Sequence, residues 1–196
     1  MSVSRDLMTA ALEADRQRPV SQGALSLALA GAELIELLRA EAAVLDGDVI
    51  LPAGVAPAGD ALLNQAATAI VRVAPYERLD DWLWRRGRGL AAAYIGQFEA
   101  EGELTVEPGR MPFLAGEATL PDTDERQHVH ELLASDDVVL TTLAAAAGFH
   151  DLVDDDAPGA EGTVLGAVTD AANELAAIQQ RHDIEQAAFD NVWRGF

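Results

Sequence analysis

The sequence predicts a compact, mostly α-helical domain built around one central apolar helix, with two small β-hairpins inserted between helices. Three observations predict this fold. Residues 21–32 carry no charge, and the apolar side chains that follow keep helical spacing. Two short strand-forming segments each contain a turn sequence. Strands and helices do not alternate along the chain, which argues against a parallel α/β sheet.

The central helix is expected to begin after Ser21, a good N-cap residue, and to run to Arg39. A short amphipathic helix over residues 3–16 precedes it. A helix that is apolar on most sides is expected to be enclosed by other helices. The apolar positions that recur three and four residues apart are Leu27, Ala30, Gly31, Leu34, Ile35 and Leu38.

The first hairpin is predicted at residues 44–51, because Asp46-Gly47 between aliphatic residues favours a type I′ turn. Asp60 is expected to cap the next helix. Helical character then covers residues 78–101 with a break at 87–89. The second hairpin is predicted at residues 103–120, with Pro108-Gly109 at its turn.

The last third of the chain is predicted to be helical as well. A capping box at Asp122 and Glu125 is expected to open a helix that ends near Ala134. The next helix follows residues 135–137 and ends at Gly148. Residues 150–162 form an acidic linker, and residues 163–196 form one or two helices. The whole chain, 1–196, is predicted to be a single domain.

Composition excludes several classes of function. The chain has 196 residues and no cysteine, which excludes a disulfide scaffold, a cysteine metal site and a thiol nucleophile. Its 13 basic and 33 acidic residues give a net charge of −20, which repels nucleic acid. We find no secretory signal and no apolar run near the roughly 20 residues of a membrane span, so a cytoplasmic location is expected.

No motif for catalysis, a cofactor or a metal emerges. The string Gly87-Arg88-Gly89-Leu90-Ala91-Ala92 follows a predicted helix, whereas a dinucleotide fingerprint follows a strand. It is therefore interpreted as a helix break. His128 and His130 are two residues apart and do not share a helix face, so no metal site is predicted. An enzyme is the least favoured class.

One concentrated positive patch stands out in this acidic chain, and two interpretations of it remain open. Trp82 and Trp84 lie beside it. In one interpretation, the arginines and Trp82 bind a phosphate headgroup. In the other, the arginines pair with carboxylates such as Asp80 and Asp81, and a tryptophan packs in the core. The patch consists of Arg85, Arg86 and Arg88.

Segments spread over residues 5–150 resemble, in the same order, those of the Golgi phosphoprotein 3 family. The resemblance implies a mostly helical, non-enzymatic protein. Eukaryotic members bind phosphatidylinositol 4-phosphate on membranes and act as adaptors for membrane enzymes and coat machinery. The segments that carry the resemblance are residues 29–37 (LAGAELIEL), the predicted hairpin at 44–51, residues 56–66 (APAGDALLNQA), Asp81-Trp82-Leu83, and Phe98 with Gly102 and Leu104.

The resemblance also implies where a lipid headgroup would bind. The family's tryptophan position falls on Ser21, and its three arginine positions fall on Ala30, Arg88 and Ala91. Only Arg88 keeps the family's residue type. A shift of the alignment by three residues places the arginine pair at Arg85 and Arg88 instead.

The second predicted hairpin is the element that would contact a membrane, through Met111, Phe113 and Leu114. The partners implied are therefore an anionic lipid headgroup or membrane surface, or a protein partner, and the protein would be peripheral to the membrane. The alternative is a soluble helical protein–protein interaction module that has lost the headgroup site. Liposome flotation distinguishes these two functions.

Overall fold

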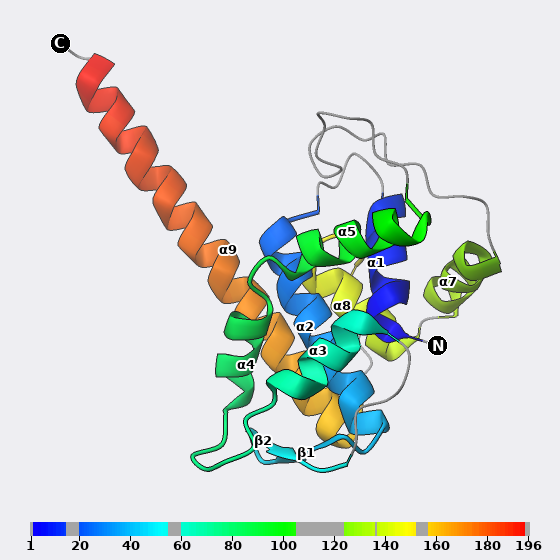
Figure 1. Cartoon of the computed structure of the whole chain (residues 1–196). Coiled ribbons are helices and arrows are strands. Elements are labelled where there is room, and N and C mark those ends of the chain that lie inside the picture. Colours follow the sequence, from blue (N-terminus) through cyan, green and yellow to red (C-terminus); the bar gives the residue numbers. More distant parts are fainter. Residues whose placement is uncertain are drawn as a thin grey trace.

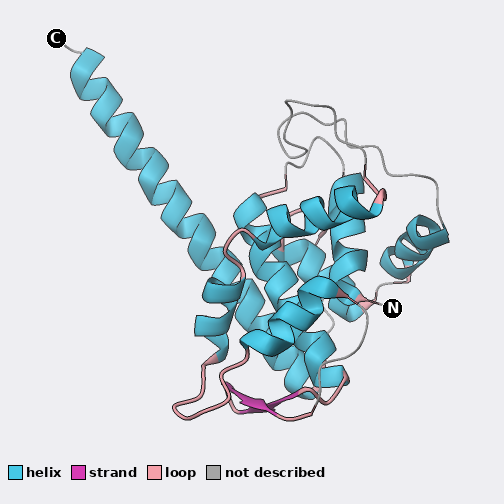
Figure 2. Cartoon of the chain, viewed as in Figure 1, coloured by secondary structure: helices cyan, strands magenta, loops and turns pink. Residues whose placement is uncertain are grey.

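The computed structural model describes residues 2–14, 20–54, 60–104, 124–135, 137–151 and 157–194. Within these ranges helices dominate, and the one sheet has two antiparallel strands (Figure 2). The helices pack around α2, Gln22–Arg39, which runs through the middle of the molecule (Figure 1). The prediction of a mostly α-helical domain with a central apolar helix is confirmed.

Helix α2 forms because its sequence is apolar on almost every side and its first turn is capped. The Ser21 hydroxyl accepts a hydrogen bond from the Ala24 N–H at 3.4 Å, and Leu34 and Ile35 have no exposed surface. Helix α7, Asp124–Ala134, packs on α1 and α8. The helices in contact with α2 are α1 (Val3–Glu13), α3 (Ala61–Ala69), α4 (Leu79–Arg86), α5 (Leu90–Glu101), α8 (Val138–Ala146) and α9 (Gly159–Arg194).

The first predicted hairpin is confirmed, but its turn is not the expected type I′ turn at Asp46-Gly47. Asp46 pairs with Val49, so the two loop residues are Gly47 and Asp48, and of these Gly47 has a positive φ, of 61°. Strands β1, Ala43–Asp46, and β2, Val49–Pro52, pair with Leu45 opposite Ile50. Ile50 is buried, and its N–H donates to the carbonyl of Glu77 at 2.9 Å, which fixes the hairpin to the segment before α4. The second predicted hairpin falls largely on residues 105–123, which lie outside the described ranges.

Aspartate side chains begin two of the helices at the predicted positions. The Leu63 N–H donates to Asp60 at 2.9 Å at the start of α3, and the Leu140 N–H donates to Asp137 at 2.9 Å at the start of α8. Each carboxylate satisfies a backbone donor that the first helical turn leaves without an intrahelical partner. The caps therefore agree with the sequence, although Asp122, the cap expected before α7, is outside the described residues.

Helix α9 begins earlier than expected. It starts at Gly159, so the predicted linker, residues 150–162, is too long at its C-terminal end. A contact from a distant segment stabilises this first turn: the Arg39 guanidinium donates to both carboxylate oxygens of Glu161, at 2.8 and 2.9 Å. The segment after residue 163 forms a single helix to Arg194, which is one of the two alternatives that the sequence left open.

Only the first half of α9 packs on the domain, and the second half extends away from it (Figure 1). The packed half passes very close to α2, because a Cβ at Gly31 would lie 2.3 Å from Cγ2 of Val168. Beyond Leu175, every α9 residue whose burial is described is exposed. These residues include the large apolar side chains Ile178, Ile184 and Phe189.

Candidate functional site

Arg85, near the end of α4, is already bound to a carboxylate. Its Nε and Nη2 atoms donate to the two carboxylate oxygens of Glu77 at 2.6 and 2.7 Å, and Nη2 also donates to the carbonyl of Ala69 at 3.2 Å. The hydrogen bonds to Glu77 are the main cause that raises the pKa of Arg85. One edge of this planar guanidinium, formed by Nε and Nη2, is therefore occupied by a bidentate contact with Glu77.

Arg86 is held in a more buried pair. Its Nε and Nη2 atoms donate to the carboxylate of Glu33 at 2.7 and 2.8 Å, and Nη2 also reaches the carbonyl of Leu62 at 2.9 Å. The Glu33 side chain has no exposed surface and accepts a further hydrogen bond from the Tyr94 hydroxyl at 3.1 Å. Burial raises the pKa of the Glu33 carboxyl, and the contacts with Arg86 oppose that rise. The pair thus joins α4 to α2 and α5.

Trp82 belongs to the core. It has no exposed surface, and its indole N–H donates to the carbonyl of Ala30 at 3.2 Å. The guanidinium carbon of Arg85 lies 5.2 Å from the centre of the Trp82 ring. This indole therefore helps to position α4 and has no face open to a ligand.

The structure does not bring Trp82 and the three arginines together on one open face. Two of the arginines pair with carboxylates and the tryptophan packs in the core, as the second interpretation of the patch expected. Their partners are Glu77 and Glu33, however, and not Asp80 and Asp81. Both aspartates lie in the exposed first turn of α4, where they stabilise the positive end of the helix dipole.

Arg88 differs from its neighbours. Its side chain is exposed and makes no ion pair with any part of the chain that the structure describes. It stands at the junction of α4 and α5, just before Gly89, whose φ of 68° is a conformation that glycine adopts without strain. This turn places Arg88 at the edge of a cavity of about 310 Å³. Other residues that line the cavity are Gln22, Ser26, Leu27, Trp84 and Leu175.

The cavity combines one cation with a largely apolar wall. Leu27 is buried there, and the half-buried side chains of Trp84 and Leu175 complete the wall. The Ser26 hydroxyl is used internally, since it donates to the carbonyl of Gln22 at 2.8 Å and accepts from the Ala91 N–H at 3.1 Å. A guanidinium beside an indole can hold an anion that also carries an apolar group.

The positions suggested by the family resemblance differ in how accessible they are to a ligand. Ser21 is the N-cap of α2, close to the cavity, whereas Ala30 and Ala91 have no exposed surface. A ligand therefore cannot reach the side chains at the last two positions. Met111, Phe113 and Leu114, the predicted membrane-contacting residues, lie outside the described residues.

Trp84, and not Trp82, is the indole at the Arg88 cavity. The spacing could have shown that the two indoles do not share one site, because residues two apart on a helix do not face each other. It does not show which of the two is buried. Leu175 lies on α9, far from Arg88 along the chain, and no local signal relates the two. Its place in the cavity follows only from the packing of α9 on α2.

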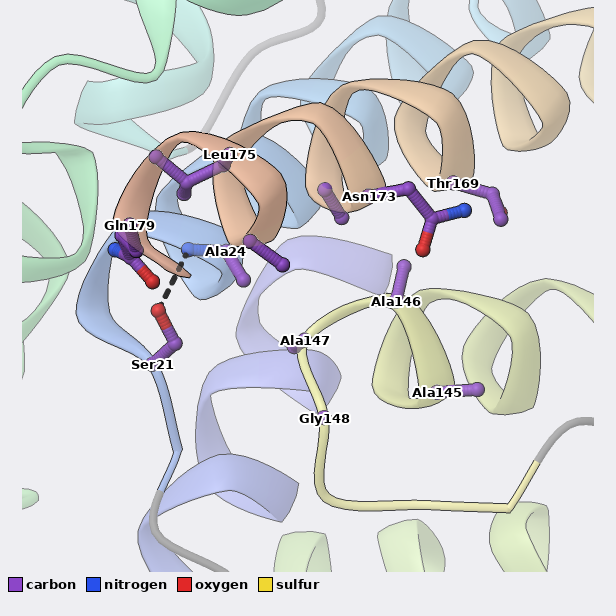
Figure 3. A pocket seen from close by; sticks show the side chains of 12 residues that line it. Ser21, Ala24, Ala145, Ala146, Ala147, Gly148, Thr169, Asn173, Leu175 and Gln179 are labelled. Atoms are coloured by element: carbon purple, nitrogen blue, oxygen red, sulfur yellow. Dashed lines mark hydrogen bonds between the residues drawn. The ribbon is translucent and has the colours of Figure 1, made fainter. Parts of the chain in front are cut away.

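A second cavity, of about 250 Å³, lies on the other side of the first turn of α2, between the end of α8 and α9 (Figure 3). Its lining contains no charged side chain. Figure 3 shows Ser21 bound to Ala24 on one side and Asn173 on the other. Leu175 lines this cavity as well as the Arg88 cavity. The lining therefore offers an anion neutral hydrogen-bond donors such as Asn173 and Gln179 but no positive charge.

Two kinds of site are absent from the part of the chain that the structure describes. No three histidine, aspartate or glutamate side chains gather there in a way that would hold a metal ion. None of the helices in these ranges combines the length and the hydrophobicity needed to cross a bilayer. The candidate site is the Arg88 cavity, where an exposed guanidinium borders an apolar wall.

Comparison with known proteins identifies a family. The family model described as Golgi phosphoprotein 3 (GPP34) matches residues 3–193. The match extends beyond the region in which motifs were recognised, and it includes α9. No curated protein matches the chain.

Proposed function

Because the chain belongs to the Golgi phosphoprotein 3 family, we propose that it is a non-enzymatic protein that binds anionic lipid headgroups at a membrane surface. The observation that carries this proposal is Arg88, whose guanidinium borders a cavity and pairs with no described carboxylate. In a chain with 33 acidic residues, an arginine without such a partner is available for an external anion.

The other members of the arginine patch support the site indirectly. The Glu33–Arg86 pair fixes α4 on α2, and Arg85 fixes α4 to Glu77 in the preceding loop. Trp82 is anchored below them in the core. These contacts hold the end of α4 in place, and with it the turn that presents Arg88.

One arginine contributes little affinity by itself, on the order of 1 kcal/mol near an anionic surface. Apolar insertion must supply the rest. We propose that Met111, Phe113 and Leu114 supply it, since burial of each can contribute up to about 1.5–3 kcal/mol. This step rests on the sequence of the predicted second hairpin.

Replacing Arg88 with glutamine is expected to weaken binding to anionic vesicles about fivefold, the effect of losing roughly 1 kcal/mol. Flotation with vesicles of phosphatidylcholine and an anionic lipid, at one ionic strength, measures it. Arg72→Gln is the matched control, because Arg72 is exposed, makes no described ion pair and does not line the cavity. Equal losses in the two variants would mean that only net charge matters and that the cavity is not the site.

Vesicle association is expected to rise with ionic strength and to disappear in Phe113→Asp. The protein carries a net charge of −20, so its repulsion from an anionic membrane exceeds the attraction of one arginine. Salt shortens the range of that repulsion, from about 30 Å at 0.01 M to about 3 Å at 1 M, and leaves apolar insertion intact. Flotation over a salt series measures this. Binding that falls steeply with salt, or that survives Phe113→Asp, would show that the arginine term dominates.

A second candidate function is protein–protein interaction through the second half of α9, which extends away from the domain. The observation that favours it is the exposure of Ile178, Ile184 and Phe189 on a helix outside the domain, since exposed apolar side chains mark interaction surfaces. A chain shortened after Ala177 keeps the Arg88 cavity and separates the two functions. Lipid binding is expected to survive this deletion. Protein–protein interaction through α9, measured by cross-linking, is expected to be lost.

A further inference from the structure

The charge of the Arg88 cavity restricts the kind of anion that it can hold. Among the residues that line it, Arg88 is the one cation, and no histidine or second arginine stands beside it. Arg85 and Arg86 cannot add to it, because Glu77 and Glu33 occupy their guanidinium forks. The described site therefore offers a single positive charge inside a protein of net charge −20.

Phosphomonoesters and phosphodiesters carry different charges at neutral pH. A phosphomonoester carries about −1.5 to −2 at neutral pH, because its second pKa is near 6. A phosphodiester lacks that second ionisation and carries one negative charge. A single guanidinium attracts both esters, but it neutralises only the diester fully. The second charge of the monoester would lose its water without a cationic partner and would meet the negative field of an acidic protein.

The rest of the lining also suits a diester. Both ester oxygens of a phosphodiester carry carbon groups, and the wall formed by Leu27, Trp84 and Leu175 can cover them. The exposed amide of Gln22 can donate to a phosphate or hydroxyl oxygen and accept from a hydroxyl. The volume, about 310 Å³, lies at the lower end of the roughly 300–1,000 Å³ of ligand pockets, enough for a headgroup.

We infer that the Arg88 cavity selects singly charged phosphodiester headgroups over phosphomonoester headgroups. This inference rests on the proposed function and specifies its ligand. It gives the three parts of the cavity separate roles. Arg88 binds the anionic oxygens, Trp84 and the two leucines cover the ester carbons, and Gln22 meets the polar end of the headgroup.

The test compares phosphatidylmethanol, a diester, with phosphatidic acid, a monoester that differs from it by one methyl group. Each is mixed with phosphatidylcholine so that the two vesicles have the same surface charge. We expect the diester vesicles to bind up to about fivefold more tightly, the effect of one unpaired charge near the surface. Arg88→Gln is expected to abolish this preference, and Arg72→Gln to keep it.

The possible results distinguish a failure of the diester selectivity from a failure of the proposed lipid binding. Equal or tighter binding of phosphatidic acid, still dependent on Arg88, would overturn the diester selectivity and leave lipid binding in place. No binding of either vesicle would overturn both. Dimethyl phosphate, added as a soluble diester, distinguishes the source of the ligand. We expect it to compete only weakly; if it displaced the protein fully, the preferred ligand would be a free diester and not a lipid.

Discussion

Replacing Arg86 with methionine is expected to lower the free energy of unfolding by about 3–5 kcal/mol. The substitution removes the cation from a carboxylate that has no exposed surface, and Glu33 then keeps only the Tyr94 hydroxyl among its side-chain partners. An uncompensated buried charge is far more costly than the pair was favourable. Urea unfolding followed by circular dichroism measures the change.

The loss of stability in Arg86→Met is expected to depend on pH. Burial raises the pKa of the Glu33 carboxyl above its ordinary value of 4.5, so the folded protein binds that proton more tightly than the unfolded chain. The stability that this tighter proton binding contributes is fully present below pH 4.5, and it is lost as the pH rises through the pKa of Glu33 in the folded protein. Removing Arg86 raises that pKa further. The loss in Arg86→Met is therefore expected to be largest at neutral pH and to shrink as the pH falls toward 4.5.

The double variant Arg86→Met with Glu33→Gln provides the control, because it removes the charge together with its partner. It is expected to recover most of the lost stability, since a buried neutral amide costs much less than a buried charge. If the double variant were as unstable as Arg86→Met alone, or if the loss were the same at all pH values, the damage would come from packing and not from the charge of Glu33.

Replacing Leu34 with alanine is expected to cost about 2–5 kcal/mol of stability. Leu34 has no exposed surface and lies on α2, the helix around which the others pack. The neighbouring helices can collapse only partly into the space left, so the loss combines the transfer of the side chain with a cavity. Chemical denaturation measures it.

Val73→Ala is the matched control for this second variant. Val73 is 77% exposed, so its truncation to alanine, which removes two carbons rather than three, is expected to change stability by no more than about 0.5 kcal/mol. A Leu34→Ala protein as stable as the wild type would show that α2 is not the rigid centre of the domain.

The sequence was sufficient for elements whose ends depend on nearby residues. Ser21 and Asp60 cap their helices through backbone groups three residues away. The glycine of Asp46-Gly47 marks the hairpin, although the turn lies one residue later than expected, at Gly47 and Asp48. The glycines at 87 and 89 end α4 and begin α5. Each of these features is a short-range property of the backbone, and the local pattern contains it.

The arginine partners could not be predicted, because distant segments determine them. Arg86 meets Glu33 from another helix, 53 residues away, and 33 acidic residues in the chain offer many alternatives. The start of α9 was missed for a similar reason. Its glycine-rich first turn is typical of a linker, and the contact that stabilises it comes from Arg39 on α2.

The second half of α9 is a long projecting helix, so a small rotation at its base moves its far end by a large distance. From Leu175 to Arg194 the helix axis extends about 28 Å, at 1.5 Å per residue. The helix leaves the domain at a close contact with α2, because a Cβ at Gly23 would lie 2.7 Å from Cδ2 of Leu175. Leu175 also lines both cavities. A tilt of about 10° at this point would swing the backbone at Arg194 by about 5 Å over that length. A small tilt of the helix at Leu175 would thus produce a larger displacement at its far end.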